Sequence, residues 1–293
     1  MQRLALVMVC CSILGYGLLV SACSHGADPL TENGSPAPGS NSNSNGSSQI
    51  ATAKATPSLL PPAGPVDPAF KPCNPYYPLT PGSHMLYTIK RPSGQVGSVV
   101  VDVSAANEKG KKVFTEVAKR LSVRGVGSGL ETTTRKYVCD GENIQVVYNL
   151  IEATNPQGVS GKFDGRFPSP SLVMMAPSSL TPGASWSYTM EADIKLPEKP
   201  DPKQAKREAN QNKKVEPKYT SKHDTIQLSF EVKGKEDVTV PAGTFHAIRI
   251  AVKVKDKDSD EYYAPGVGMV RRSLPDGTVW ELSEYNGLTP RAE

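Results

Sequence analysis

The sequence predicts an all-β protein with mostly antiparallel, curved sheets, arranged as an open barrel or a sandwich. Three observations support this fold class. Apolar and polar residues alternate with a period of two in at least five segments, as in strands that bury one face. Asp-Gly and similar pairs, which form tight hairpin turns, separate many of these segments. No long amphipathic helix is present, and 25 Gly and 26 Pro among 293 residues are typical of a β protein rich in turns.

The first 22 residues are expected to be a lipoprotein signal peptide. Arg3 supplies a positive charge, and the apolar run Leu4–Val20 has the length of a signal-peptide core. The sequence Leu-Val-Ser-Ala-Cys that ends at Cys23 resembles the lipobox of bacterial lipoproteins. That resemblance implies cleavage before Cys23 and attachment of acyl chains such as palmitate to it. A plain secretory signal with an incidental cysteine, or an uncleaved membrane anchor, are the alternatives.

The same resemblance predicts the location of the protein. Two or more acyl chains hold a protein stably on a membrane. Ser24, rather than Asp, follows the cysteine. In Gram-negative lipoproteins this implies the outer membrane, with the folded part facing the periplasm or the cell surface. We therefore expect a lipid-anchored protein of the bacterial cell envelope.

Residues 23–72 are expected to be a disordered linker. Of the 49 residues from Ser24 to Pro72, 26 are Ser, Gly, Pro or Asn. Such a composition buries too little apolar surface to offset the entropy lost on ordering. The linker would hold a folded domain away from the membrane surface.

The cysteine count leaves one pair for the folded part. Cys10 and Cys11 belong to the expected signal peptide and Cys23 to the anchor, so Cys73 and Cys139 remain. In an oxidising compartment outside the cytoplasm, two remaining cysteines predict a disulfide. Two free thiols or half of a metal site are the alternatives.

Alternation predicts where the strands lie. The apolar positions on one face are Val99, Val101 and Val103; Ile144, Val146, Tyr148 and Leu150; Trp186, Tyr188, Met190, Ala192 and Ile194; Ile226, Leu228, Phe230 and Val232; and Ile248, Ile250, Val252 and Val254. The expected turns are Ser93-Gly94, Lys109-Gly110, Asp140-Gly141 and Asp276-Gly277. Antiparallel sheets with one buried and one solvated face follow from this pattern.

An internal repeat divides the folded part into two related β units. The ten residues Leu79–Thr88 recur as Leu180–Thr189, with six identical positions that include Leu-Thr-Pro-Gly and a tyrosine. The repeat predicts a first unit at 73–176 and a second unit at 177–293. Residues 195–222, with nine Lys or Arg and four Asp or Glu, are expected to form a mobile basic insertion in the second unit.

The second unit resembles the DUF3108-like or TapB-like bacterial envelope proteins. The resemblance is carried by the Leu-Thr-Pro-Gly turn with Trp186 and Tyr188, by Glu236–Phe245, by Tyr263–Val270 and by the closing strand Trp280–Tyr285. The first unit resembles a degenerate copy, with Met85 where the second unit has Trp186. It implies a β-rich domain outside the cytoplasm and no particular activity.

No pattern of catalytic or metal-ligating residues stands out. His25, His84, His223 and His246 are scattered, and Asp256, Asp258, Asp260 and Glu261 are expected to form a solvated hairpin end rather than a calcium loop. Tyr76, Tyr77, Tyr262 and Tyr263 are expected to pack in the core or at a sheet edge, with a groove lining as the alternative. We therefore predict no catalytic residue, no metal and no cofactor.

Three classes of function stay open. A noncatalytic, membrane-anchored protein that binds an envelope partner or maintains the envelope is favoured by the anchor, the linker and the β domain. The second class is a carrier or sensor that holds an apolar ligand in a cavity of the curved sheet. An enzyme is the third class, and we do not expect one. The net charge of +4 is too small to predict a nucleic-acid partner.

Overall fold

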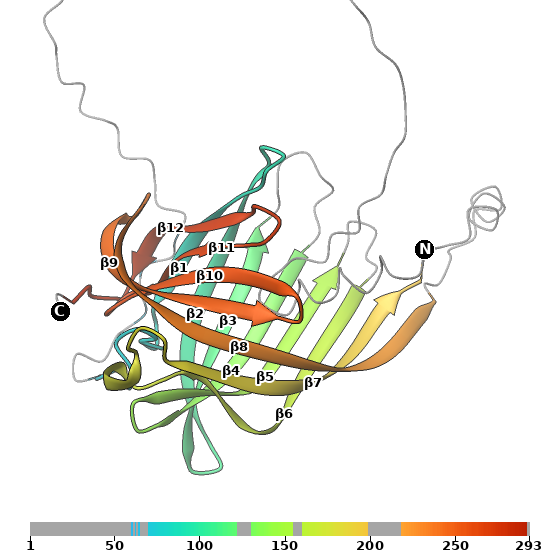
Figure 1. The fold of residues 1–293 in the computed structure, drawn as a ribbon. Coiled ribbons are helices and arrows are strands. Elements are labelled where there is room, and N and C mark those ends of the chain that lie inside the picture. Colours follow the sequence, from blue (N-terminus) through green and yellow to red (C-terminus); the bar gives the residue numbers. More distant parts are fainter. Residues whose placement is uncertain are drawn as a thin grey trace, which may run out of the picture. The chain divides into compact units, whose positions relative to one another are not determined.

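In the computed structural model, the described residues form twelve strands that follow one another around a closed barrel (Figure 1). Each strand pairs antiparallel with its neighbour along the chain, and β12 returns to β1. The all-β antiparallel prediction is confirmed, and the sheet closes into a barrel instead of staying open. The structure describes residues 60, 62, 64, 70–121, 130–154, 160–198 and 218–291.

The elements have the following bounds. They are β1 His84–Lys90, β2 Val96–Glu108, β3 Lys111–Leu121, β4 Leu130–Asp140, β5 Asn143–Thr154, β6 Ser160–Met174, the short 3-10 helix η1 Pro177–Ser179, β7 Ser185–Pro197, β8 Tyr219–Val240, β9 Gly243–Val254, β10 Lys257–Ala264, β11 Gly268–Ser273 and β12 Val279–Asn286. The two predicted β units, 73–176 and 177–293, thus contribute β1–β6 and β7–β12 to one sheet.

Several predicted parts lie outside the described residues. These are the signal peptide 1–22, Cys23, most of the linker 23–72 and residues 199–217 of the basic insertion. Among the described residues, no helix has the length and the apolar character needed to cross a membrane.

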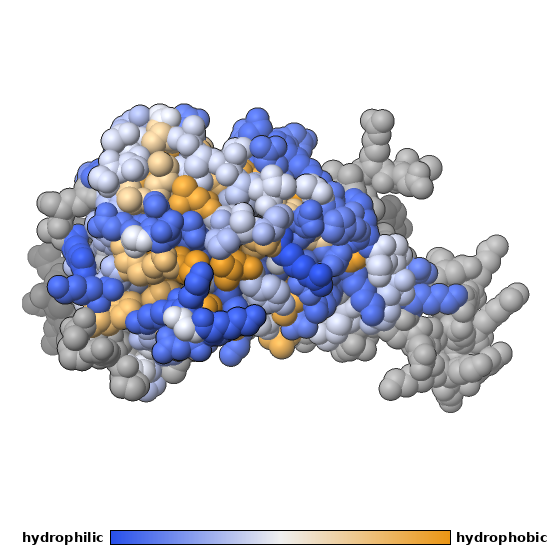
Figure 2. Space-filling model, turned by 90° about the horizontal axis from the view of Figure 1, so that it is seen from below, coloured by the Kyte–Doolittle hydropathy of each residue, from blue (hydrophilic) through white to orange (hydrophobic). Residues whose placement is uncertain are grey.

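The predicted alternation locates the core correctly in most strands. The side chains of Val99, Val101 and Val103 are buried in β2, and those of Met190, Ala192 and Ile194 are buried in β7. The predicted apolar positions of β8 and β9 are likewise buried. In the view from below, apolar residues gather in the middle of the surface, with hydrophilic residues around them (Figure 2).

The alternation fails in the second half of β5. Tyr148 and Leu150 were expected to face the core, but Asn149 and Ile151 are buried in their place. The register explains this, because β4 pairs Lys136 with Tyr148 and the next residue with Val146, which leaves Val147 as an extra residue. A bulge of one residue reverses which side chains face inward.

The hairpin turns have the predicted chemistry. Lys109 and Gly110 have φ angles of 51° and 78°, so both central residues of the β2–β3 turn occupy the left-handed region. Two-residue turns of this kind match the twist of the strands that they connect. Asp140-Gly141 and Asp276-Gly277 also lie in turns between consecutive strands, and Gly141 and Gly277 have positive φ angles.

The two Leu-Thr-Pro-Gly turns make equivalent hydrogen bonds. The backbone N–H of Gly82 donates to Val103 O at 2.8 Å, and the N–H of Gly183 donates to Val232 O at 2.8 Å. The φ angles of these glycines are 81° and 85°. Each turn therefore leads the chain into the first strand of its unit and fixes the start of that strand against the next one.

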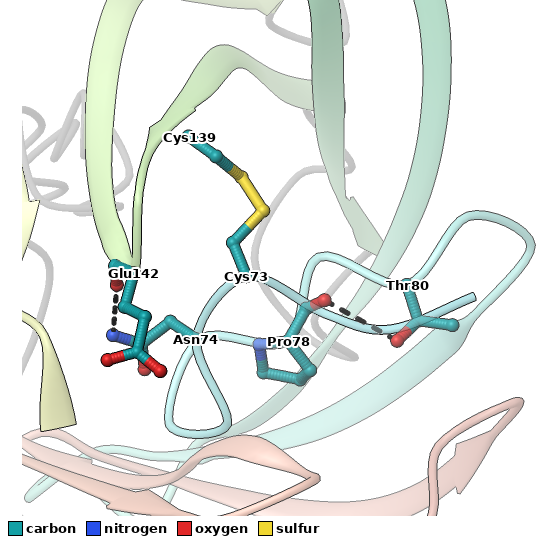
Figure 3. Close-up of a disulfide and its surroundings, with 6 residues drawn as sticks. All are labelled: Cys73, Asn74, Pro78, Thr80, Cys139 and Glu142. Carbon is teal, nitrogen blue, oxygen red and sulfur yellow. Dashed lines mark hydrogen bonds between the residues drawn. A yellow bond between two sulfur atoms is a disulfide. The ribbon is translucent and has the colours of Figure 1, made fainter.

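A disulfide holds the segment before β1 against β4 (Figure 3). It joins Cys73 to Cys139, with Cα atoms 6.3 Å apart. The next residue, Asn74, is fully buried and its Nδ2 donates to Glu142 O at 2.9 Å and to Met175 O at 2.8 Å. These contacts fix the entry of the segment into the barrel and direct Tyr77 toward the interior.

One joint of the barrel wall is incompletely paired. The β6–β7 ladder comprises Lys162–Arg166 with Glu191–Lys195 and ends there, within the described residues. Pro168 and Pro170 follow in β6, and because proline has no N–H, each removes one hydrogen-bond donor from the ladder. We call this joint the seam, defined as Phe167–Met174 of β6 facing Ser185–Met190 of β7.

Candidate functional site

Three Arg–Glu pairs project into the barrel, and each joins residues directly opposite one another on neighbouring strands. Two pairs connect β3 and β4, and the third connects β10 and β11. The pairs are Glu116–Arg135, Arg120–Glu131 and Glu261–Arg272. Their side chains are at most 19% exposed. Charged side chains are rarely buried unless they are paired, so six largely buried charges mark this interior as unusual.

Glu116 is the centre of the first cluster. Its carboxylate accepts hydrogen bonds from Arg135 Nη1 at 3.1 Å, from Tyr77 Oη at 3.3 Å and from Tyr137 Oη at 3.5 Å. The hydroxyl oxygens of Tyr77 and Tyr137 also lie 2.8 Å apart. A carboxylate that accepts three hydrogen bonds is well compensated for its burial.

Glu261 is the centre of a second cluster. It accepts hydrogen bonds from Arg272 and from Tyr263, and its side chain is only 4% exposed. The rings of Tyr77 and Tyr263 lie 5.9 Å apart, so the two clusters are in contact. The expectation that Glu261 belongs to a solvated hairpin end is therefore wrong. It lies within β10, whereas Lys255 lies in the exposed turn before this strand.

Burial keeps the tyrosines of these clusters neutral. Burial is the main cause that raises the pKa of Tyr77 well above its usual range, followed by the Glu116 carboxylate. Burial and then Glu261 raise the pKa of Tyr263 in the same way. Burial alone would lower the pKa of Arg135, but Tyr137 and Glu116 outweigh it and raise that pKa. The clusters therefore contain neutral hydroxyl groups beside the Arg–Glu pairs over the physiological pH range.

Two adjoining cavities lie beside these groups. The first, which we call the valine chamber, has a volume of about 80 Å³ and lies between an apolar wall and a charged wall. Val99, Val101 and Val103 of β2 belong to the apolar wall, and the charged wall contains the β3–β4 ion pairs. This arrangement offers a ligand both apolar contact and hydrogen-bonding groups.

The second cavity, the aromatic chamber, has a volume of about 50 Å³. The rings of Phe167, Tyr188 and Phe230 line it from β6, β7 and β8. Its lining includes Tyr77, Arg135, Tyr263 and Arg272, which also line the valine chamber. Together the two chambers have room for about ten water molecules, which is the scale of one small ligand.

The structure places the cysteines, tyrosines and histidines that the sequence analysis considered in several different parts of the fold. Cys73 and Cys139 are bonded to each other at the entry of the segment that carries Tyr77. Tyr77 and Tyr263 line both chambers, so the alternative of a lining role applies to them. Cys23 and His25 lie outside the described residues. The other histidines each contact an aspartate on a neighbouring strand: His84 with Asp102, His223 with Asp193 and His246 with Asp237.

The arrangement can bind a ligand through hydrogen bonds, charge and ring contacts. In the described part of the chain, no group of three or more His, Cys, Asp or Glu side chains is placed to hold a metal ion. Arg and neutral Tyr supply donors, and Glu supplies acceptors. Since each charge already has a partner of opposite sign, the site favours a ligand that adds hydrogen bonds without replacing an ion pair.

Sequence reasoning missed the charged interior. Glu116, Arg120, Glu131 and Arg135 alternate along β3 and β4, but neither strand has a purely apolar face, so period two did not identify an inner face. The charges of the two strands, taken together, could have identified these pairs. When the strands are aligned antiparallel, each Glu of one strand faces an Arg of the other.

Comparison with known proteins finds a family model that matches part of the chain and two solved structures of low sequence identity. The model of the DUF3108-like family matches residues 164–274. A solved structure from Bacteroides fragilis, of a protein inferred to be exported and with a YmcC-like fold, is 13% identical, with a TM-score of 0.38, and covers 73% of this chain and 100% of its own. A solved structure from Parabacteroides distasonis, of a protein inferred to be a lipoprotein, is 14% identical, with a TM-score of 0.36. It covers 74% of this chain and 100% of its own.

The search of curated proteins found no match. The segment that matches the family model begins in β6 and ends just after β11, so it includes both sides of the seam, the whole of β7 and the Glu261 cluster. Over that stretch the chain is similar to the DUF3108-like family.

Proposed function

We propose that this protein is a lipid-anchored envelope protein outside the cytoplasm, whose noncatalytic barrel binds a small ligand in its interior. The observation that supports this most directly is the pair of chambers lined by the Arg–Glu pairs. Charges are costly to bury, and a barrel that only needed stability would be better served by apolar side chains. We infer that the charged groups are kept for recognition.

The anchor and the compartment are supported by two cysteine features. The sequence around Cys23 resembles a lipobox. The structure contains the Cys73–Cys139 disulfide, and such bonds persist mainly in oxidising compartments. A Cys23→Ala variant is expected to leave the membrane fraction and to lose the mass of the acyl chains. Retention of the variant on the membrane would contradict the anchor.

A carrier of an apolar ligand is the second candidate. Its support is the valine wall of β2, which offers apolar contact opposite the charged wall. A long acyl chain needs more space than about 80 Å³, so this candidate requires the barrel to widen when it binds. A small ligand requires no such change, and we therefore place it first.

Native mass spectrometry tests both candidates. The full chain is purified from its own host in mild detergent and measured before and after denaturation. A small polar mass that is lost on denaturation supports the first candidate, and a lipid mass supports the second. An interior that is empty in every preparation, with an intact disulfide, contradicts ligand binding.

A pair of variants connects the bound mass to the interior. Glu116→Gln removes the charge at the centre of the first cluster and is expected to lower the bound fraction. Asp260→Asn removes one partner of the Arg249–Asp260 pair, which lies on β9 and β10 and does not line either chamber. This control should keep the bound fraction unchanged. Equal loss in both variants would show that the ligand is not held by Glu116.

A further inference from the structure

The edge of β7 that faces the seam carries unpaired backbone groups. Val232 of β8 donates its N–H to Ala184 O at 2.9 Å, just before β7 begins. Because the backbone groups of a strand point alternately to its two sides, the even-numbered residues of β7 bond to β8. The residues that direct N–H and C=O toward the seam are Ser185, Ser187 and Thr189. In the described part of the chain, no strand pairs with these three residues on that side.

β6 does not supply the missing partner strand. Residues 167–170 of β6 stand where β5 has only Val147, so β6 forms a long bulge here. Residues 168–170, which include two prolines, are exposed to solvent. Bulges bend the strand that contains them and interrupt its pairing. The edge of β7 is therefore open at the point where β6 bends away.

The internal repeat shows what covers the equivalent edge of β1. The start of β7 corresponds to the start of β1, which pairs antiparallel with Glu281–Asn286 of β12. Under this cover Met85 is 8% exposed and Tyr87 is 2% exposed. Their equivalents in β7, Trp186 and Tyr188, are only half-buried. The edge of β7 thus lacks an antiparallel strand that the edge of β1 has.

Two properties of the β7 edge favour its occupation by a strand. The indole Nε1 of Trp186 is buried and has no hydrogen-bond partner among the described residues. A carbonyl oxygen of an added segment would accept this N–H. In addition, Ser185–Met190 includes no charged residue and no proline, which are the usual protection of an open strand edge. An edge without that protection is suited to pair with another chain.

We propose that the β7 edge of the seam docks an extended segment of a partner protein, which pairs antiparallel to Ser185–Thr189. Backbone hydrogen bonds attach the segment, and its side chains provide selectivity. The segment alternates apolar and polar residues, with the apolar side chains against Trp186 and Tyr188. Because residues 168–170 are exposed beside the edge, a single segment reaches it more readily than the sheet of a second folded copy. This docking does not depend on a ligand in the interior.

Fluorescence anisotropy with the full chain tests the docking. The probe is a labelled peptide with the sequence of β12, Val279–Asn286, because this segment covers the equivalent edge of β1. The control peptide has the same sequence with every backbone nitrogen methylated, so it keeps the side chains and loses the N–H donors. The first peptide should bind saturably, and the methylated peptide should bind about tenfold more weakly. Absence of saturable binding by the first peptide overturns the proposal.

Two substitutions of one residue test whether the peptide lies on the β7 edge. Ser187→Pro removes the N–H in the middle of this edge and should weaken binding by about tenfold. Since no strand of the described structure pairs with that N–H, the variant should fold. Ser187→Ala keeps the N–H and should bind as the parent does. Thermal unfolding checks both variants, and Ser187→Lys, which places a charge on the edge, replaces Ser187→Pro if that variant does not fold.

The remaining outcomes concern the occupant and the interior. Equal binding by Ser187→Pro and Ser187→Ala contradicts the assigned edge. A dimer of the parent that Ser187→Pro abolishes, measured by light scattering, would identify a second copy as the occupant and overturn the partner. Ser187 lines neither chamber, so Ser187→Pro should lose the peptide and keep any small mass bound in the interior. Failure of the docking is thereby distinguishable from failure of the proposed function.

Discussion

The hydroxyl oxygens of Tyr77 and Tyr137 lie 2.8 Å apart, and the residues that carry them are also held together covalently. Tyr77 follows Cys73 by four residues, and Tyr137 precedes Cys139 by two. The disulfide and the tyrosine pair thus connect the same two segments, one at the rim and one inside the barrel. The covalent bond keeps Tyr77 in place beside Glu116.

Loss of the disulfide should destabilise the barrel strongly. The bond closes a loop between residues 66 apart, which in the chain-entropy model contributes up to about 4 kcal/mol to the free energy of unfolding. The Cys73→Ser, Cys139→Ser double variant should therefore unfold at a lower urea concentration than the parent. Dithiothreitol should shift the parent to the same midpoint and leave the double variant unchanged. A shift of the double variant by the reductant would mean that the reagent acts elsewhere.

Removing one partner of a buried ion pair should cost more than removing both. Glu116→Gln leaves Arg135 buried without its carboxylate, and such a change costs about 3–5 kcal/mol in the free energy of unfolding. Adding Arg135→Met should recover part of that loss, since no unpaired charge stays behind. Urea denaturation of the single and double variants measures the difference. The outward variant Asp260→Asn should cost less than about 1 kcal/mol, and a cost equal to that of Glu116→Gln would refute the argument from burial.

The barrel should lose stability above pH 10. Burial raises the pKa of Tyr77, Tyr137 and Tyr263 above the ordinary value of 10.0, so the folded state holds these protons when the unfolded state has lost them. Their contribution to stability is complete below pH 10 and declines as the pH rises further. Absorbance at 295 nm should show that these hydroxyl groups ionise only as the chain unfolds. In strong denaturant all tyrosines should titrate together near pH 10. Ionisation of every tyrosine in the folded protein would contradict their burial.

Substitution by alanine should reduce stability by different amounts at two glycines that have nearly the same φ angle. Gly94 and Gly266 have φ angles of 78° and 79°, so the strain on an L residue is the same at both. A Cβ at residue 94 meets nothing within 4 Å, whereas one at residue 266 would lie 2.0 Å from Thr289 O. Gly94→Ala is expected to cost about 1 kcal/mol. Gly266→Ala should cost clearly more because the backbone must move. Equal melting temperatures of the two variants would show that the backbone at Thr289 moves away from the added methyl group at little cost.

Strands with one apolar face were predictable from the sequence, and the charged interior was not. In β7 the run from Trp186 to Ile194 keeps one period and identifies its inner face correctly. In β5 the single extra residue Val147 shifts the period, so Asn149 faces inward although the sequence pattern assigns it to the solvent. No local signal in the sequence marks a bulge, because its cause is the pairing with β4 and β6.

The burial of Glu261 is a second feature that the local sequence pattern did not predict. This residue stands in an acidic stretch next to three aspartates, and local composition therefore favoured a solvated hairpin. Its burial depends on Arg272, which lies directly opposite on β11. A contact between strands decides whether such a carboxylate is stable inside, and a window of neighbouring residues does not contain that information.

Closure of the barrel makes its assembly depend on the two ends of the chain. The hydroxyl groups of Thr88 in β1 and Ser283 in β12 lie 2.6 Å apart, although 195 residues separate them in sequence. A chain that emerges N-terminus first therefore holds β1 as an unpaired edge until the last strand arrives. Contacts of such long range slow folding, and exposed strand edges recruit other chains. Newly made protein should consequently be most prone to aggregation just before β12 becomes available, and loss of that single strand would leave both edges of the sheet open.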